Sequence, residues 1–174
     1  MNLEQSTNAT FYQYRLLKKT TFSKLLTQGL VLVPILCLIG LTVFHGPLSI
    51  VNFLLAAPIS LWIQFVICRS VLIIVSHSYN KHWRFSWRLP WVGYMPNQYI
   101  WYSIFRKVHL HYTWIGLCII AVLIPWSPIS LIISLLFWHL WLLFPRLFTF
   151  AVLLNQRKDG MIKFNEQDVS YYIQ

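Results

Sequence analysis

The sequence predicts an all-α integral membrane protein with four transmembrane helices arranged as two helical hairpins. First, 57% of the 174 residues are hydrophobic and only 10% are charged, which is more apolar surface than a soluble domain of this size can bury. Second, the apolar residues occur in stretches of about 20, the length that crosses the hydrocarbon core as a helix. Third, the four acidic residues all lie near the two ends of the chain, so no carboxylate interrupts an apolar stretch.

The four predicted spans are Leu25–Phe44, Leu48–Ile67, Val108–Ile124 and Ile129–Leu147. Each is predicted to be a helix, because a lone strand would leave its backbone unpaired in lipid. Short uncharged linkers, HGP at 45–47 and PWSP at 125–128, join the spans into two hairpins. The first apolar stretch is longer than the roughly 7–15 residues of a signal-peptide core, and no A-x-A cleavage site follows it, so we expect it to be retained.

Charge predicts the orientation of these spans. The net charge is +10, and every Lys and Arg lies outside the two short linkers. The positive-inside rule therefore predicts that three segments are cytoplasmic: the N-terminal segment 1–24, the central segment 76–107 and the C-terminal tail 155–174. They enclose a first hairpin at 25–75 and a second at 108–154. The chain carries no organelle signal, so we expect a multi-pass protein of the cell inner (cytoplasmic) membrane with both termini in the cytoplasm.

The two hairpins also resemble each other. LCLIGLTVFHGPLSI in the first aligns with LCIIAVLIPWSPISL in the second, which matches Pro47 to Pro128 and Ser49 to Ser130. Leucine-rich spans match by chance, and proline suits the first turn of any helix. An internal duplication and a chance likeness both remain open.

The central segment interleaves aromatic and basic residues, beginning HSYNKHWRFSWRLPW. Trp rings at headgroup level and cations facing anionic phospholipids predict a segment that lies along the membrane surface. Docking onto a partner is the alternative, and no nucleic acid is expected because no recognition motif is present. The residues predicted at the headgroup interface are Arg69, Lys81, Trp83, Arg84, Trp87, Arg88, Arg106, Lys107 and Arg146.

Four histidines are the candidate metal ligands: His77, His82, His109 and His111. The chain has no HH pair of the kind that membrane di-iron hydroxylases and desaturases use. We therefore expect these histidines to form hydrogen bonds to lipid or backbone, and we expect no metal and no cofactor. Cys37, Cys68 and Cys118 have no CxxC spacing and are expected to be small packing residues.

The second span carries a stripe of small and polar residues at every fourth position: Asn52, Ala56, Ser60 and Gln64. Such a stripe lies on one helix face and permits close helix packing, with hydrogen bonds between helices. It packs the protein's own bundle, docks another membrane subunit or lines a path for a solute.

Apolar sequence continues past the second and fourth spans. It predicts helices over 47–76 and 128–155, about 42–45 Å long at 1.5 Å per residue, against a hydrocarbon core of about 30 Å. The apolar side chains that extend beyond the hydrocarbon core must be covered by the central segment or by a partner. The C-terminal tail is expected to be amphipathic and available for docking.

The motifs that the sequence lacks narrow the classes of function to consider. The chain has no Walker loop, GxSxG or HExxH motif, and its spans lack the carboxylates of ion-driven carriers. We therefore expect a non-enzymatic subunit or accessory factor of a larger membrane assembly, such as a secretion, conjugation or respiratory complex, with other membrane proteins as partners. The alternatives are a transport or pore protein for an anion or small polar solute and, third, a His-dependent membrane metalloenzyme.

Overall fold

The computed structural model describes residues 15–75, 82–154, 156, 159–165 and 168–173. The elements follow in the order β1 (Arg15–Thr21), α1 (Lys24–His45), α2 (Leu48–Val75), β2 (Trp83–Ser86), β3 (Gly93–Pro96), β4 (Ile100–Trp101), α3 (Tyr102–Leu123), α4 (Ile129–Leu153), β5 (Met161–Phe164) and β6 (Asp168–Ile173). The chain is mostly helical, at 66%.

Three of the described helices, α1, α2 and α4, are long and apolar enough to cross a membrane, so the chain is a multi-pass membrane protein. They match the first, second and fourth predicted spans. The third predicted span lies in α3, which begins at Tyr102 and takes in Arg106 and Lys107. These additional polar residues make α3 less apolar than the other three helices. Neither a four-span count nor the internal duplication is confirmed.

Local signals place the helix ends. The Ser23 hydroxyl accepts a hydrogen bond from the Leu26 N–H (3.2 Å) and caps the start of α1. Gly46 ends α1 with a φ of 79°, and its N–H bonds to the Thr42 carbonyl at 3.0 Å. The 28 residues of α2 and the 25 of α4 confirm the long helices expected from the apolar pattern.

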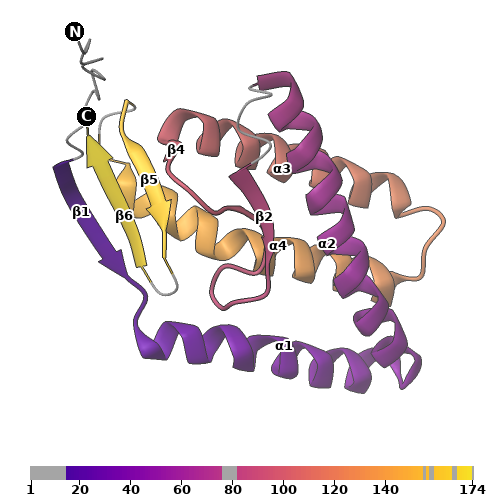
Figure 1. Ribbon diagram of the computed structural model, residues 1–174. Coiled ribbons are helices and arrows are strands. Elements are labelled where there is room, and N and C mark those ends of the chain that lie inside the picture. Colours follow the sequence, from indigo (N-terminus) through magenta and orange to yellow (C-terminus); the bar gives the residue numbers. More distant parts are fainter. Residues whose placement is uncertain (1–14, 76–81, 155, 157–158, 166–167, 174) are drawn as a thin grey trace, which may run out of the picture.

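The polar segments form a sheet that the sequence analysis did not predict. Its strand order is β1-β6-β5-β4, and every neighbouring pair is antiparallel. The sheet therefore joins segments that precede α1, precede α3 and follow α4, and it stands at one end of the helices (Figure 1). We call this end of the bundle the sheet end.

The C-terminal tail differs from the sequence prediction. It was expected to be free for docking, but β5 and β6 are the two inner strands of the sheet. Val169, Ser170 and Tyr171 are buried there. Both edges of β6 are paired, with β1 and with β5, so its backbone groups are already used.

The central segment forms a second small sheet, the hairpin of β2 and β3, which pairs Trp83 with Pro96 and Ser86 with Gly93. The hairpin lies beside α2 (Figure 1). One apolar cluster joins hairpin residues to Val71 and Leu72 of α2, to Leu153 of α4 and to strands of the larger sheet. The chain itself thus covers Val71, Leu72 and Leu153 of the apolar excess, whereas Ile74 of α2 (83%) and Leu154 after α4 (72%) stay exposed.

Candidate functional site

The β2–β3 hairpin organises the sheet end. Gly93 opens β3 with a φ of 103°, a conformation that side-chain-bearing residues rarely adopt. A Cβ at this position would meet the Gln64 side-chain amide of α2. Glycine therefore lets the hairpin backbone approach the buried face of α2 directly.

Arg146 anchors the hairpin to α4. One guanidinium nitrogen donates to the Leu142 carbonyl, and the other donates to the Val92 carbonyl at 2.8 Å. The side chain is only 1% exposed, so the prediction that it reaches the lipid headgroups is wrong. Two carbonyl acceptors within the protein replace the water or phosphate that an interfacial arginine would seek.

Trp83 is the second predicted headgroup residue that lies in the interior instead. It is 4% exposed, and its ring stacks on His109 (5.9 Å between centroids) and packs against Tyr94 (5.5 Å). The Trp83 ring therefore faces α3, which contains His109. Burial raises the pKa of the Tyr94 phenol, and the Arg69 guanidinium acts in the opposite direction, so the phenol keeps its proton.

The remaining predicted headgroup residues lie at the surface or partly so. Arg69, Arg84, Trp87, Arg88 and Lys107 are exposed and Arg106 is half-buried, whereas Lys81 lies outside the described residues. The Arg69 guanidinium lies 5.6 Å from the centre of the Phe65 ring, which holds it beside α2.

Polar side chains from three helices gather in the interior next to Arg146. The guanidinium is close enough to His109, Tyr112 and Cys68 to interact with them electrostatically. Tyr112 in turn packs against His139 of α4 at 4.7 Å between ring centroids. Within the described residues, four polar atoms of this polar cluster have no hydrogen-bond partner: His109 Nε2, Tyr112 OH, His139 Nε2 and Arg146 Nε. Buried polar atoms without partners are uncommon, which makes the polar cluster a candidate site.

The predicted stripe on α2 faces its own bundle. Asn52 Nδ2 donates to Ser130 Oγ of α4 at 2.7 Å, and Ala56 packs with Ile120 and Leu135. Ser60 and Gln64 are 4% and 0% exposed. In the structure the stripe packs inside its own bundle, where α3, α4 and the hairpin cover it, so it is not exposed as a docking face for another subunit.

The histidines proposed as metal ligands are not brought together. His109 is buried, and its Nδ1–H donates to the Phe105 carbonyl at 2.9 Å, while the exposed His111 bonds in the same way to Lys107 at 2.7 Å. Residues two apart on a helix point to different sides. Across the described ranges no three His, Cys, Asp or Glu side chains could hold a metal ion. His82 is exposed, and His77 lies outside the described residues.

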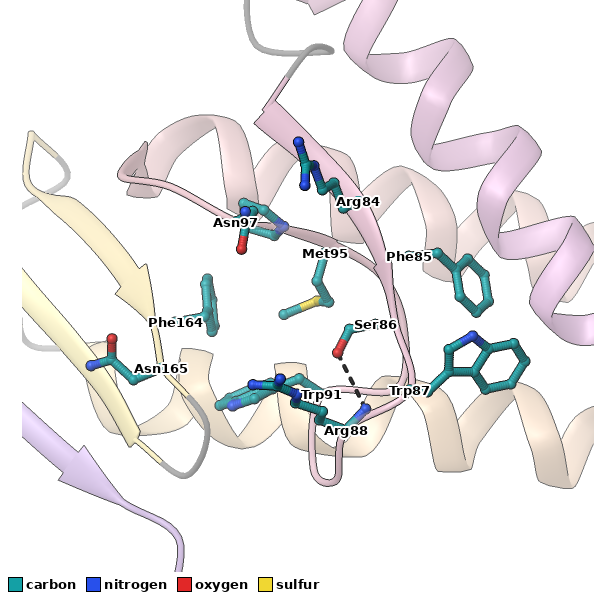
Figure 2. A pocket seen from close by; sticks show the side chains of 11 residues that line it. Arg84, Phe85, Ser86, Trp87, Arg88, Trp91, Met95, Asn97, Phe164 and Asn165 are labelled. Atoms are coloured by element: carbon teal, nitrogen blue, oxygen red, sulfur yellow. Dashed lines mark hydrogen bonds between the residues drawn. The ribbon is translucent and has the colours of Figure 1, made fainter.

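A pocket of about 520 Å³ lies between the hairpin and the end of β5. Figure 2 shows Arg84, Ser86 and Arg88 on the hairpin, Met95 in the middle, and Phe164 and Asn165 on the opposite side. Trp91 closes one wall and is held edge-on between Phe22 (5.0 Å) and Phe164 (4.9 Å). Trp91 is 4% exposed, and its indole N–H has no acceptor among the described residues.

A second, apolar groove runs between α1 and α4. It measures about 430 Å³ and is lined by Leu26, Gly29, Leu30, Val33, Phe137, Leu140, Trp141 and Phe144. The Trp141 indole N–H donates to the Leu30 carbonyl at 2.9 Å and so leaves no polar group seeking a partner there. Only Leu30 and Leu41 of the 22 residues of α1 are buried. The groove is therefore dry and open.

The chain matches no protein-family model, no curated protein and no solved structure.

Sequence reasoning missed several of these residues. Trp91 and Asn165 of the pocket and Tyr112 and His139 of the polar cluster were not predicted as site residues. A helical pattern carries some signal for the cluster, since His109, Tyr112 and Gly116 follow each other at spacings of three and four on one face of α3. Nothing in the sequence pattern pairs Trp91 with Phe164.

Proposed function

We propose that the protein is a non-enzymatic subunit or accessory factor of a larger membrane assembly, with four membrane crossings and the sheet end in the cytoplasm. Strand pairing supports the number of crossings. Strands β4 and β5 are hydrogen-bonded neighbours, so they lie on the same side of the membrane. The chain between them contains α3 and α4, and a complete crossing by α4 requires a return crossing by α3.

The same argument applies to β1 and β4, which belong to one sheet and are separated in sequence by α1 and α2. Every described Lys and Arg lies in the sheet, in the hairpin or in the halves of the helices nearest to them. The positive-inside rule then favours the cytoplasm for the sheet end. Both termini would be on that side.

The observation that carries the association function is the poor packing of α1. A helix with two buried residues in 22 contributes little to its own bundle, and it leaves the dry groove against α4 open. Gly29 lies in this groove, and a Cβ added there would meet no atom within 4 Å. Small residues allow close approach of helix backbones in membranes. An apolar transmembrane helix of a partner protein fits this surface.

The test replaces Gly29 with leucine, which fills the groove while leaving the span apolar. Gly40→Leu is the matched control, because Gly40 is also open within 4 Å on α1 but does not line the groove. After mild solubilisation at equal expression, Gly29→Leu should lose partner proteins that Gly40→Leu keeps. Equal recovery of partners with both variants would contradict the proposal, as would a groove that retains only lipid.

A second candidate function is passage of an anion or small polar solute, favoured by the polar cluster at Arg146. A guanidinium stays charged in proteins, and among the described residues it has carbonyl acceptors but no carboxylate partner. Proteoliposomes would test this function through halide or nitrate flux. Arg146→Gln should abolish a flux that Arg15→Gln, a charge loss on β1, leaves intact; no flux with the unaltered protein would exclude this candidate.

A further inference from the structure

A shallow apolar hollow lies between α2 and the side of the β2–β3 hairpin that faces this helix. It measures about 400 Å³ and is lined by Pro58, Leu61, Trp62 and Phe65 of α2 and by Phe85 and Trp87 of the hairpin. Figure 2 shows the Phe85 and Trp87 side chains pointing toward α2. Aromatic residues from two separate segments thus share one surface.

The rings of this hollow are open to the surroundings of the protein. Trp87 is 74% exposed, Trp62 is 66% exposed and Phe85 is 39% exposed. Phe85 and Trp87 support each other, with 4.9 Å between their ring centroids. Because α2 is long and apolar enough to cross a membrane, rings exposed on it contact lipid. Tryptophan is enriched where the hydrocarbon core meets the headgroups, which suits a hollow close to a membrane surface.

A cation stands at one end of the hollow. Arg69 is exposed, follows Phe65 by one helical turn, and holds its guanidinium 5.6 Å from the centre of the Phe65 ring. Pro58, at the other end of the hollow, is 11 residues earlier in α2, which is about 16 Å along the helix axis at 1.5 Å per residue. No carboxylate of the described residues forms an ion pair with Arg69, and the segment 76–81 that follows α2 contains no acid.

The sequence of α2 places this cation at the level of the headgroups. Arg69 is the only charged residue of the helix, and the 21 residues before it, 48–68, are about the number that crosses the hydrocarbon core. An arginine directly after such a stretch reaches the phosphates of the nearer leaflet. Because α2 returns toward the hairpin, this is the leaflet at the sheet end.

We infer that the hollow is a binding site for one anionic phospholipid of this leaflet. The Arg69 guanidinium donates to the phosphate oxygens, which it can bind bidentately, and an acyl chain lies along Trp62, Phe65 and Trp87. An apolar partner helix would offer Arg69 no acceptor, since its backbone carbonyls are already bonded within the helix. The net charge of +10 favours an anionic headgroup over a zwitterionic one, whose ammonium group the protein would repel.

This site is independent of the partner site proposed above, because that groove is formed by α1 and α4. The experiment counts lipids bound to the full-length protein in mild detergent by native mass spectrometry. The probes are phosphatidylglycerol and phosphatidylcholine with the same acyl chains, titrated separately. The unaltered protein should bind one phosphatidylglycerol saturably, and more tightly than phosphatidylcholine.

Two substitutions address the two halves of the site. Arg69→Gln should weaken phosphatidylglycerol binding about tenfold, as expected for one charge-assisted hydrogen bond, and should remove the preference over phosphatidylcholine. Trp62→Ala should weaken the binding of both lipids severalfold, because it removes part of the surface that holds the acyl chain. Both residues are exposed, so the core stays intact, which thermal unfolding would verify.

Arg15→Gln and Trp114→Ala are the matched controls. They remove an exposed charge from β1 and a 68% exposed ring from α3, and neither residue lines the hollow. Both should bind phosphatidylglycerol like the unaltered protein. Should Arg69→Gln fail to fold, the comparison of Trp62→Ala with Trp114→Ala still decides the question. Equal loss in Arg69→Gln and Arg15→Gln, equal binding of the two lipids by the unaltered protein, or a protein dimer that Trp62→Ala dissociates with lipid binding unchanged overturns the inference.

Discussion

Replacing Gly93 with alanine is the most direct test of how the hairpin is attached to the helices. The substitution adds one methyl group at a φ of 103° and directs it at the Gln64 amide. Gln64 is completely buried on α2, so its side chain cannot move away into solvent. Two separate costs follow.

The first cost is backbone strain, about 1–3 kcal/mol for a non-glycine residue in a sparsely populated region. The second is overpacking against Gln64, typically about 1–3 kcal/mol. The sum is roughly 2–6 kcal/mol of unfolding free energy. For a chain of this size 1 kcal/mol corresponds to about 2–4 °C, so the melting temperature should fall by at least about 4 °C.

The assay is thermal unfolding in mild detergent. Gly40→Ala is the control: Gly40 lies inside α1 with open space around it, so alanine should raise helix stability by about 0.8–1 kcal/mol. Gln64→Ala in the Gly93→Ala background should recover the overpacking part but not the strain. A melting temperature for Gly93→Ala within about 1 °C of the unaltered protein would refute the close contact between hairpin and α2.

Three further predictions address anchoring, topology and helix packing. Arg146→Gln should release the Val92 carbonyl and so speed tryptic cleavage after Arg84 and Arg88 severalfold. The control Arg69→Gln should leave the cleavage rate unchanged, and equal rates for the two variants would mean that Arg146 does not hold the hairpin. In a cysteine-free background, an impermeant thiol reagent should label Ser127→Cys but not Trp87→Cys in intact cells, and labelling of Trp87→Cys from outside would overturn the proposed orientation. A double-mutant cycle of Asn52→Ala and Ser130→Ala, measured by thermal unfolding, should give a coupling free energy of about 0.6 kcal/mol, and at most about 1.7 kcal/mol. Additive effects of the two substitutions would contradict the 2.7 Å hydrogen bond between these side chains.

The sequence alone determined the helices and the class of protein. About 20 consecutive apolar residues can be stable in only a few ways, because lipid offers no partner to an open backbone. The bounds of α2 and α4 could therefore be predicted to within a few residues, including their extension past the predicted spans. The stripe from Asn52 to Gln64 was also visible, since helical periodicity is local.

Only the tertiary structure decided what the polar segments do. The strands β1 and β6 lie at opposite ends of the chain, and their pairing depends on the helices that bring those ends together. Short strands carry weak sequence signals compared with long apolar helices. Arg146 shows the same limit: its sequence position suits the membrane surface, but the carbonyl of Val92, 54 residues away, accepts its hydrogen bond inside the protein. The pocket likewise joins Trp91 to Phe164, because long-range folding, and no local pattern, sets the hairpin beside the sheet.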